Sequence, residues 1–189
     1  MEKYGGRLKG RTEKEGIRDP FIKLLERGEI EGWERSIALR SVRVDPVNSE
    51  DFGSSPDLVL INPRPAIGIV ECKRASSSEA KHGMFEQVLL YGEMVRSLAP
   101  DTFKERVHRK RSKAHGDPKV LDAFLQHDIS DIIREPYLIV VVDRWGNRMN
   151  QTSRLTLLLL NQALGKLGRP PIEVWAVGAG RAERVHVAS

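Results

Sequence analysis

The fold is decided by residues 56–73, whose sequence is PDLVLINPRPAIGIVECK. Two apolar runs of strand length, 58–61 and 67–70, flank the turn-forming sequence Asn62-Pro63-Arg64-Pro65. Short apolar runs on either side of a proline-rich break are typical of two strands joined by a turn. The stretch therefore predicts a β-hairpin.

Charged residues stand at the open end of this hairpin. Asp57 opens the first strand, and Glu71 and Lys73 close the second. Because alternate residues of a strand share a face, Glu71 and Lys73 continue the face of Ile67 and Ile69. Charged side chains are rarely buried without a partner, and a divalent metal ion is a candidate for it. The alternative interpretation is a salt-bridge cluster on the surface.

A second motif, Gln87-Val-Leu-Leu-Tyr91, falls in a helix expected from about residue 79 to residue 98. Its two polar residues are four apart and so lie on one helical face. Pro56-Asp57 with Glu71-Cys72-Lys73 resembles the metal-dependent nucleases of the PD-(D/E)xK superfamily. The Gln87/Tyr91 element is similar to that of RecB-like nucleases and of the nuclease domain that begins type I restriction motor subunits.

The resemblance covers roughly residues 12–145 in element order and implies a fold and an activity. The fold would be a restriction endonuclease-like α/β sandwich of three layers, with a mixed central sheet flanked by helices. The activity would be Mg²⁺-dependent hydrolysis of phosphodiester bonds in DNA, in restriction, defence or DNA repair. Mn²⁺ could substitute for Mg²⁺.

The resemblance also implies roles for the motif residues. Asp57, Glu71 and the backbone carbonyl of Cys72 would bind the metal. Lys73 would hold or deprotonate the attacking water, or stabilise the phosphate, and these roles stay open. Gln87 and Tyr91 would border the active site; alternatively, Tyr91 is a core residue and Gln87 a polar residue of the helix surface.

The first helix is expected to contribute a further acid. Glu15 stands three residues before Arg18, as in type I restriction nuclease domains, and Glu13 is its competitor. The alternative is that both are exposed glutamates stabilised by the helix dipole.

The rest of the chain supplies the other layers. The first helix either begins near Glu13 and contains Pro20 or begins at Pro20, and Gly28 is expected to end it. Helix 152–167 is expected to turn Leu155, Leu158, Leu159 and Gln162 inward. The remaining expectations are strands at 33–45, 137–142, 172–177 and 184–187, and one or two helices within 120–133. Alternation of strands and helices after the hairpin favours an α/β fold with a mixed sheet.

Length and charge bound the function further. The 189 residues suit a single domain, 1–189, with a flexible lead-in at 1–12 and a basic loop at 101–118. The net charge of +5 is compatible with nucleic acid, and the basic loop could follow a DNA backbone or simply be solvated. A single cysteine excludes an internal disulfide.

The expected partner is DNA, most simply duplex. A helicase or restriction complex, or a second copy in a homodimer, are further candidates. The longest apolar run is too short to cross a membrane, and we expect a soluble cytoplasmic protein that binds no membrane. The alternative function is a non-catalytic module that binds nucleic acid or assembles complexes and has kept the nuclease fold.

Overall fold

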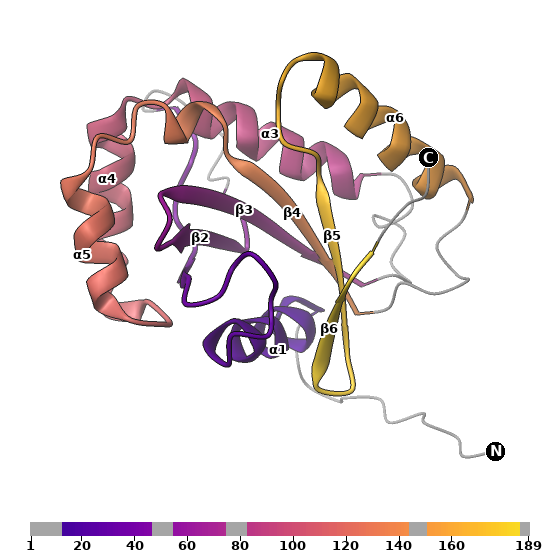
Figure 1. The fold of residues 1–189 in the computed structure, drawn as a ribbon, viewed down its shortest axis with the longest axis horizontal. Helices are drawn as coiled ribbons and strands as arrows, with labels where there is room; N and C mark the ends of the chain where they lie inside the picture. Colours follow the sequence, from indigo (N-terminus) through magenta and orange to yellow (C-terminus); the bar gives the residue numbers. More distant parts are fainter. Residues whose placement is uncertain (1–12, 47–54, 75–82, 144–150, 186–189) are drawn as a thin grey trace.

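The computed structural model describes residues 13–46, 55–74, 83–143 and 151–185. Among them, six strands form one mixed sheet in the order β1-β2-β3-β4-β5-β6, and helices flank it (Figure 1). This arrangement confirms the expected α/β class. The strands are β1 Ile37–Arg40, β2 Leu58–Asn62, β3 Ala66–Lys73, β4 Tyr137–Val142, β5 Glu173–Gly178 and β6 Arg181–Arg184. The helices are α1 Glu13–Glu26, α3 Met84–Ser97, α4 Pro100–His108, α5 Pro118–Gln126 and α6 Gln151–Lys166, with short 3₁₀ turns at Arg111–Lys113 and Ile132–Arg134. The expected lead-in 1–12 lies outside the described residues.

The predicted hairpin is confirmed as strands β2 and β3, and β3 is one of the two central strands of the sheet. Strands β2 and β3 pair antiparallel, with Leu58 opposite Val70. Strand β4 lies parallel to β3, with Lys73 opposite Val142, and β5 lies parallel to β4. The carboxyl ends of β3 and β4 therefore meet at one edge of the sheet.

The two faces of the sheet are covered by different helices. Ile67 and Ile69 belong to the core that also contains buried residues of α3, α4, α5 and α6. Val70 and Cys72 belong to the second core, which α1 covers. Figure 1 shows α1 on one side of the sheet and α3 and α6 on the other. The alternation predicted for β3 is confirmed, and the fold has three layers.

The first helix begins at Glu13 and contains Pro20, so a start at Pro20 is wrong. Gly28 ends it as predicted. The backbone of Gly28 has a φ of +72°, and the next amide, that of Glu29, donates to the carbonyl of Leu24 at 2.9 Å. This is the hydrogen bond of a glycine-capped helix end.

The strand expected over 33–45 is shorter than predicted. Only β1, Ile37–Arg40, pairs with β2, because Ser41 adopts a φ of +52° that breaks the extended backbone. Val42 and Val44 are still buried, so their apolar character reflects packing in a turn region rather than a longer strand.

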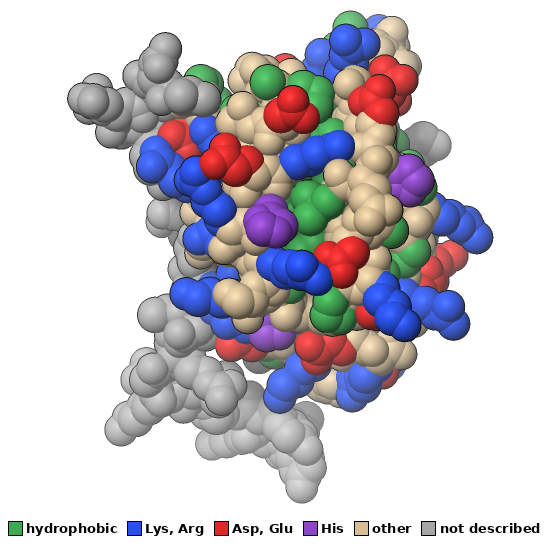
Figure 2. Space-filling model, turned by 90° about the vertical axis from the view of Figure 1, so that its left-hand side faces the viewer, with side chains coloured by type: hydrophobic (Ala, Val, Ile, Leu, Met, Phe, Trp, Pro, Cys, Tyr) green, Lys and Arg blue, Asp and Glu red, His purple; other side chains and the backbone are tan. Residues whose placement is uncertain are grey.

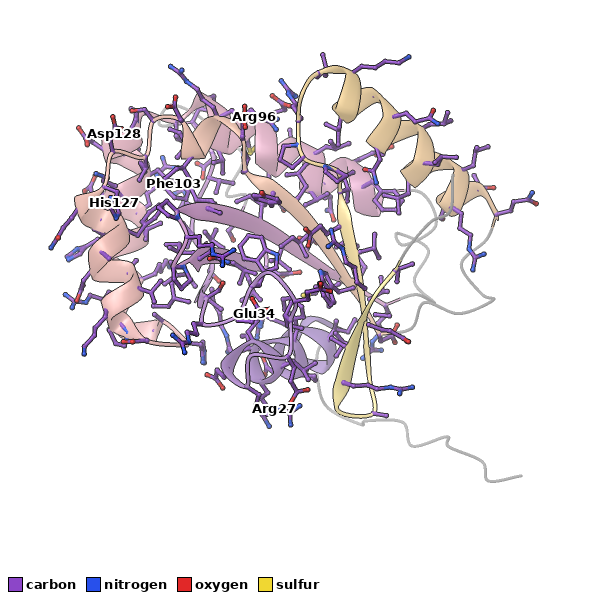
Figure 3. All side chains as sticks on the ribbon, in the orientation of Figure 1. Arg27, Glu34, Arg96, Phe103, His127 and Asp128 are labelled. Carbon is purple, nitrogen blue, oxygen red and sulfur yellow. The ribbon has the colours of Figure 1, made fainter. Side chains whose placement is uncertain are left out.

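The basic loop predicted at 101–118 is wrong as a secondary-structure assignment. The segment contains α4 and the first 3₁₀ turn. Phe103 and Val107, four residues apart, are fully buried, and Phe103 points from α4 toward the sheet (Figure 3). Two apolar residues at helical spacing were enough to anchor this helix among many charged neighbours.

Helix α6 was predicted as a helix, but the prediction of its buried face was wrong. Its buried side chains are Ser153, Leu157 and Leu164. Leu155 and Leu159, which were expected to point inward, are 54% and 55% exposed. In a run of consecutive leucines the apolar face cannot be read from hydrophobicity alone. Gln162 is also exposed, and Leu158 is half-buried.

Within the described residues, no helix is both long enough and apolar enough to cross a membrane.

Candidate active site

The structure brings Asp57, Glu71 and Lys73 together at the edge where β3 ends. All three are buried, with exposed fractions of 5%, 1% and 6%. The ammonium of Lys73 lies 3.2 Å from Oε1 of Glu71. Burial of this kind contradicts the interpretation as a surface salt-bridge cluster.

The hairpin itself positions Asp57. Leu58 lies opposite Val70, so the antiparallel register places Asp57 level with Glu71. The backbone N–H of Cys72 donates to Oδ2 of Asp57 at 2.9 Å. The carboxylate of Asp57, at the open end of the hairpin, is thus fixed against the backbone of the residue that lies between Glu71 and Lys73.

Cys72 takes part through its backbone. Its side chain is buried on the α1 side of the sheet, away from the face that Glu71 and Lys73 share by strand alternation. The thiol is therefore a small packed group in the second core. Its carbonyl as a metal ligand stays a prediction.

Helix α3 covers the face on which the acids lie. It packs on β3 and β4, and a Cβ placed at Gly92 would come within 2.7 Å of Cδ2 of Leu138 on β4. Glycine at this position therefore lets helix and sheet approach closely. The same helix carries Gln87 and Tyr91, and its core contacts lie on the face of β3 that Glu71 and Lys73 share by strand alternation.

Gln87 and Tyr91 differ in their surroundings. Tyr91 is half-buried and packs against the core of this face, as the core interpretation predicted. The side-chain oxygen of Gln87 is buried, and within the described residues it accepts no hydrogen bond. Buried amide oxygens usually have a partner, which a water, a ligand or a residue outside the described ranges would supply here.

The first turn of α1 lies near the same edge of the sheet. A Cβ placed at Gly16 would lie 3.9 Å from Nη2 of Arg74, the residue that follows β3. The side chains of Glu13 and Glu15 lie outside the described residues, so which of them approaches the site stays a prediction.

The donor set fits a small, hard cation. Mg²⁺ prefers oxygen ligands, keeps several of its waters and is commonly bound through one or two carboxylates. Asp57 and Glu71 supply two carboxylates, and helix α3, which packs on β3, carries Gln87, whose side-chain oxygen accepts no hydrogen bond from the described residues. The described residues contain no cluster of three or more His, Cys, Asp or Glu side chains that could hold a metal. A metal here would therefore retain much of its water.

The three arginines around α4, Arg106, Arg109 and Arg111, are engaged within the protein. Arg106 donates to the backbone carbonyls of Arg43 and Asp45, at 3.1 and 2.6 Å. Arg109 pairs with Glu105. Positive and negative side chains are interspersed on this side of the molecule (Figure 2). Contact of this segment with DNA stays a prediction, and internal pairing reduces the charge that is available for it.

Arg111 is engaged in the same way, in an ion pair with Asp122 of α5 at 2.7 Å.

A cavity in this region is remote from Asp57 and Glu71. It has a volume of about 210 Å³, lies between α5 and the turn of the β2–β3 hairpin, and includes Pro63 and Val120 in its lining. That turn is at the far end of the hairpin from Lys73.

A further buried acid, Glu173, was not predicted from the sequence. Glu173 is 9% exposed and lies on the α1 side of the sheet. Its Oε2 accepts hydrogen bonds from the indole N–H groups of Trp33 and Trp175, at 3.4 and 3.2 Å, and its Oε1 accepts one from Arg184 at 3.0 Å. The signal was present in Glu173-Val-Trp175, since residues two apart share a strand face.

No protein-family model matches the chain, and neither the curated proteins nor the solved structures contain a significant match to it. Inferences about function therefore depend on the site itself.

Proposed function

We propose that the protein is a metal-dependent nuclease that hydrolyses phosphodiester bonds of DNA, built on a restriction endonuclease-like fold. The observation that carries the proposal is the buried group of Asp57, Glu71 and Lys73 at the carboxyl edge of β3, beneath α3. These two acids and the lysine lie on the face covered by the helix of Gln87 and Tyr91. They are the residues through which the sequence resembles these nucleases.

Stability alone does not account for this group. Burying an ion pair costs several kcal/mol of desolvation per ion, and well-packed apolar residues in the same place are often equally or more stabilising. Two carboxylates side by side add mutual repulsion. Retention of such a group in the core is easier to understand if the acids bind a cation from solution.

The residues have distinct tasks in this proposal. Asp57 and Glu71 would hold Mg²⁺, which supplies charge stabilisation and a more acidic bound water when it is present. The N–H of Cys72 fixes the carboxylate of Asp57, so this ligand is oriented before substrate arrives. Lys73, as an ammonium held by Glu71, would donate a hydrogen bond to the attacking water or to a phosphate oxygen.

Gln87 would act as a positioning residue. Its buried amide oxygen can accept a hydrogen bond from a water or from an ammonium on the face beneath α3. Tyr91 would support the helix by packing, and its hydroxyl would contribute less than the Gln87 amide.

Incubation of the purified protein with supercoiled, linear and single-stranded DNA, in Mg²⁺, Mn²⁺ or EDTA, tests the activity. We expect cleavage that needs a divalent metal and that stops in EDTA. Absence of cleavage on all three substrates in both metals would contradict the proposal. Metal-independent DNA binding without cleavage would favour the non-catalytic module instead.

A further inference from the structure

Two arginines share a single carboxylate beside the end of β1. Nη2 of Arg40, the last residue of β1, lies 3.0 Å from Oδ1 of Asp19 on α1. Nε of Arg18 lies 3.2 Å from the same oxygen. Two positive charges therefore face one negative charge, and the group keeps an excess of positive charge. The Arg40 side chain is 33% exposed, so an anion can reach it from solvent.

Arg40 has hydrogen-bond donors that the protein does not use. A guanidinium carries five N–H groups. Within the described ranges, the Arg40 side chain donates to Asp19, and its buried Nε has no acceptor. A donor buried in this way is costly, and an acceptor that arrives with a ligand would remove the cost. Arginine binds phosphate through paired N–H groups, so the group has the charge and the donors that a phosphate requires.

A second group of the same composition shows the completed arrangement. Arg96 and Arg169 share Oε1 of Glu93. Nε of Arg96 donates to the backbone carbonyl of Arg134 at 2.8 Å, so this donor has its acceptor within the protein. Arg134 stands shortly before β4, which places this group where β4 begins, at the edge of the sheet opposite to the acids. The group at Arg40 differs in its unused donor and in its position.

The position of Arg40 connects it with the proposed active site. Arg40 lies opposite Leu58 in the antiparallel ladder of β1 and β2, and Asp57 is the neighbour of Leu58 in the chain. The carboxylate of Asp57 accepts from the backbone N–H of Cys72, so it lies against the sheet backbone rather than deep in either helix layer. Arg40 reaches the same edge from the α1 side, where it contacts Asp19.

We propose that Arg40, assisted by Arg18, binds a backbone phosphate of the DNA strand, next to the bond that the acid pair would hydrolyse. The inference rests on the proposed function for the identity of its ligand. Asp19 would hold both guanidinium groups in place and leave their excess positive charge to the anion. Contacts to phosphate carry no base information, so this one would act on all sequences alike.

Binding of a labelled DNA duplex in EDTA, where the proposed nuclease cannot cut, tests the contact. Arg40→Gln should weaken binding about tenfold at about 100 mM salt. It should also lower the slope of log affinity against log salt by about 0.9, the value for one phosphate contact on duplex DNA. Arg169→Gln is the matched control, because Arg169 is also 33% exposed and also shares a carboxylate with another arginine. An unchanged slope in Arg40→Gln, or a parent chain that binds no DNA at low salt, would overturn the proposal.

Replacement of Asp19 separates a phosphate site from a purely structural ion pair. Arg40→Gln and Asp19→Asn both break the link between β1 and α1. A structural ion pair predicts the same direction of change in both variants. A phosphate site predicts opposite directions, because Asp19→Asn leaves both arginines to the anion and should bind DNA several-fold more tightly. Glu93→Gln makes the same charge change in the other group and should change binding much less. Weaker binding by Asp19→Asn, or an equal gain in Glu93→Gln, would contradict the assignment.

These outcomes are distinguishable from failure of the proposed nuclease activity. If the parent chain cuts DNA while Arg40→Gln keeps the parent salt slope, the phosphate contact is wrong and the nuclease stands. If the parent chain binds DNA through Arg40 and cuts nothing, the contact stands and the nuclease is wrong.

Discussion

Two buried groups of charged residues lie on opposite faces of the same sheet, and they are built differently. On the α1 side, Glu173 is one carboxylate surrounded by donors: two indole N–H groups and the guanidinium of Arg184. On the α3 side, Asp57 and Glu71 are two carboxylates beside one lysine. Donors that saturate a single acid indicate a structural role. The two acids beside Lys73 are the group that we propose binds a cation.

The comparison predicts opposite consequences for the same kind of substitution. A carboxylate that serves chemistry can be neutralised with little loss of stability and a large loss of rate. A carboxylate that anchors packing shows the reverse. Each variant is therefore best measured in both assays, because either assay alone would miss the contrast.

The largest expected effect is on cleavage by Glu71→Gln and Asp57→Asn. Removing one charge from the acid pair should lower the rate by about 10³-fold or more, since loss of even one catalytic hydrogen-bond donor commonly costs 10²–10³-fold. Thermal stability of Asp57→Asn should be unchanged or higher, because repulsion between the acids is relieved. Glu71→Gln should melt lower, because it removes the carboxylate that pairs with the buried ammonium of Lys73. Initial rates on plasmid DNA and thermal melts of both variants check this. Full activity in either variant would remove its residue from the site.

Glu173→Gln should give the reverse result. The amide is similar in shape, but its nitrogen cannot accept a hydrogen bond, so one of the donors from Trp33, Trp175 and Arg184 loses its buried partner. We expect the free energy of unfolding to fall by about 2–3 kcal/mol, the scale for a buried hydrogen bond to a charged group. Urea denaturation measures it, with cleavage per folded molecule as the control. If stability is unchanged and cleavage is lost, the two groups have been assigned the wrong way round.

Gly68→Ala should damage the same structural group through packing. A Cβ at this position would come within 2.8 Å of the ring of Trp33 and 3.0 Å of Cδ1 of Ile139. Overpacking of a core typically costs about 1–3 kcal/mol, and some of that strain can be relieved by a shift of the tryptophan. We expect a loss of about 1–2 kcal/mol in urea unfolding. Gly165→Ala is the control, since nothing lies within 4 Å of a Cβ there. No difference between the two would argue against close packing of Trp33 on β3.

The smallest effect concerns pH and Asp45, which lies in neither group. Arg43 donates to both oxygens of this carboxylate, at 3.0 and 2.6 Å, and so lowers the pKa of Asp45 below its usual range. A lowered pKa in the folded state contributes stability above the unfolded pKa, and that contribution is lost as pH falls through the folded value. Because the Arg43 side chain is 60% exposed, the gain should be below about 1 kcal/mol.

Comparison of Asp45→Asn with the parent chain checks this prediction. The parent should be slightly more stable at neutral pH, and the difference should shrink in acid, below the usual range of an aspartate. Urea midpoints from about pH 7 to about pH 3 measure it. A difference that stays constant with pH would mean that the ion pair with Arg43 contributes no linked protonation.

Strand alternation explains why the hairpin, and the grouping of Glu71 with Lys73 on one face, could be predicted. Apolar runs around Asn62-Pro63-Arg64-Pro65 determined both strands, and the period of two put Glu71 and Lys73 on one face. Strand β4 followed from its continuous apolar run at Tyr137–Val142.

The errors also have local causes. Ser41 ends β1 because its φ is positive, and serine has no residue-type preference from which this could have been predicted. Helix α4 depends on only two buried residues, Phe103 and Val107, among many charges. In α6 the consecutive leucines at 157–160 point in successive directions around the helix, so only the tertiary structure decides which of them are buried. Glu173 was hidden because its partner Trp33 is distant in sequence.

The most direct test of the central claim is metal binding by the acid pair in the absence of DNA. Titration calorimetry with Mn²⁺ should show a divalent-ion site in the parent chain that is lost in Asp57→Asn and in Glu71→Gln and retained in Glu173→Gln. Each variant should first be shown to be folded by circular dichroism. Binding by Asp57→Asn and Glu71→Gln that equals binding by the parent chain would contradict the assignment of Asp57 and Glu71 as metal ligands.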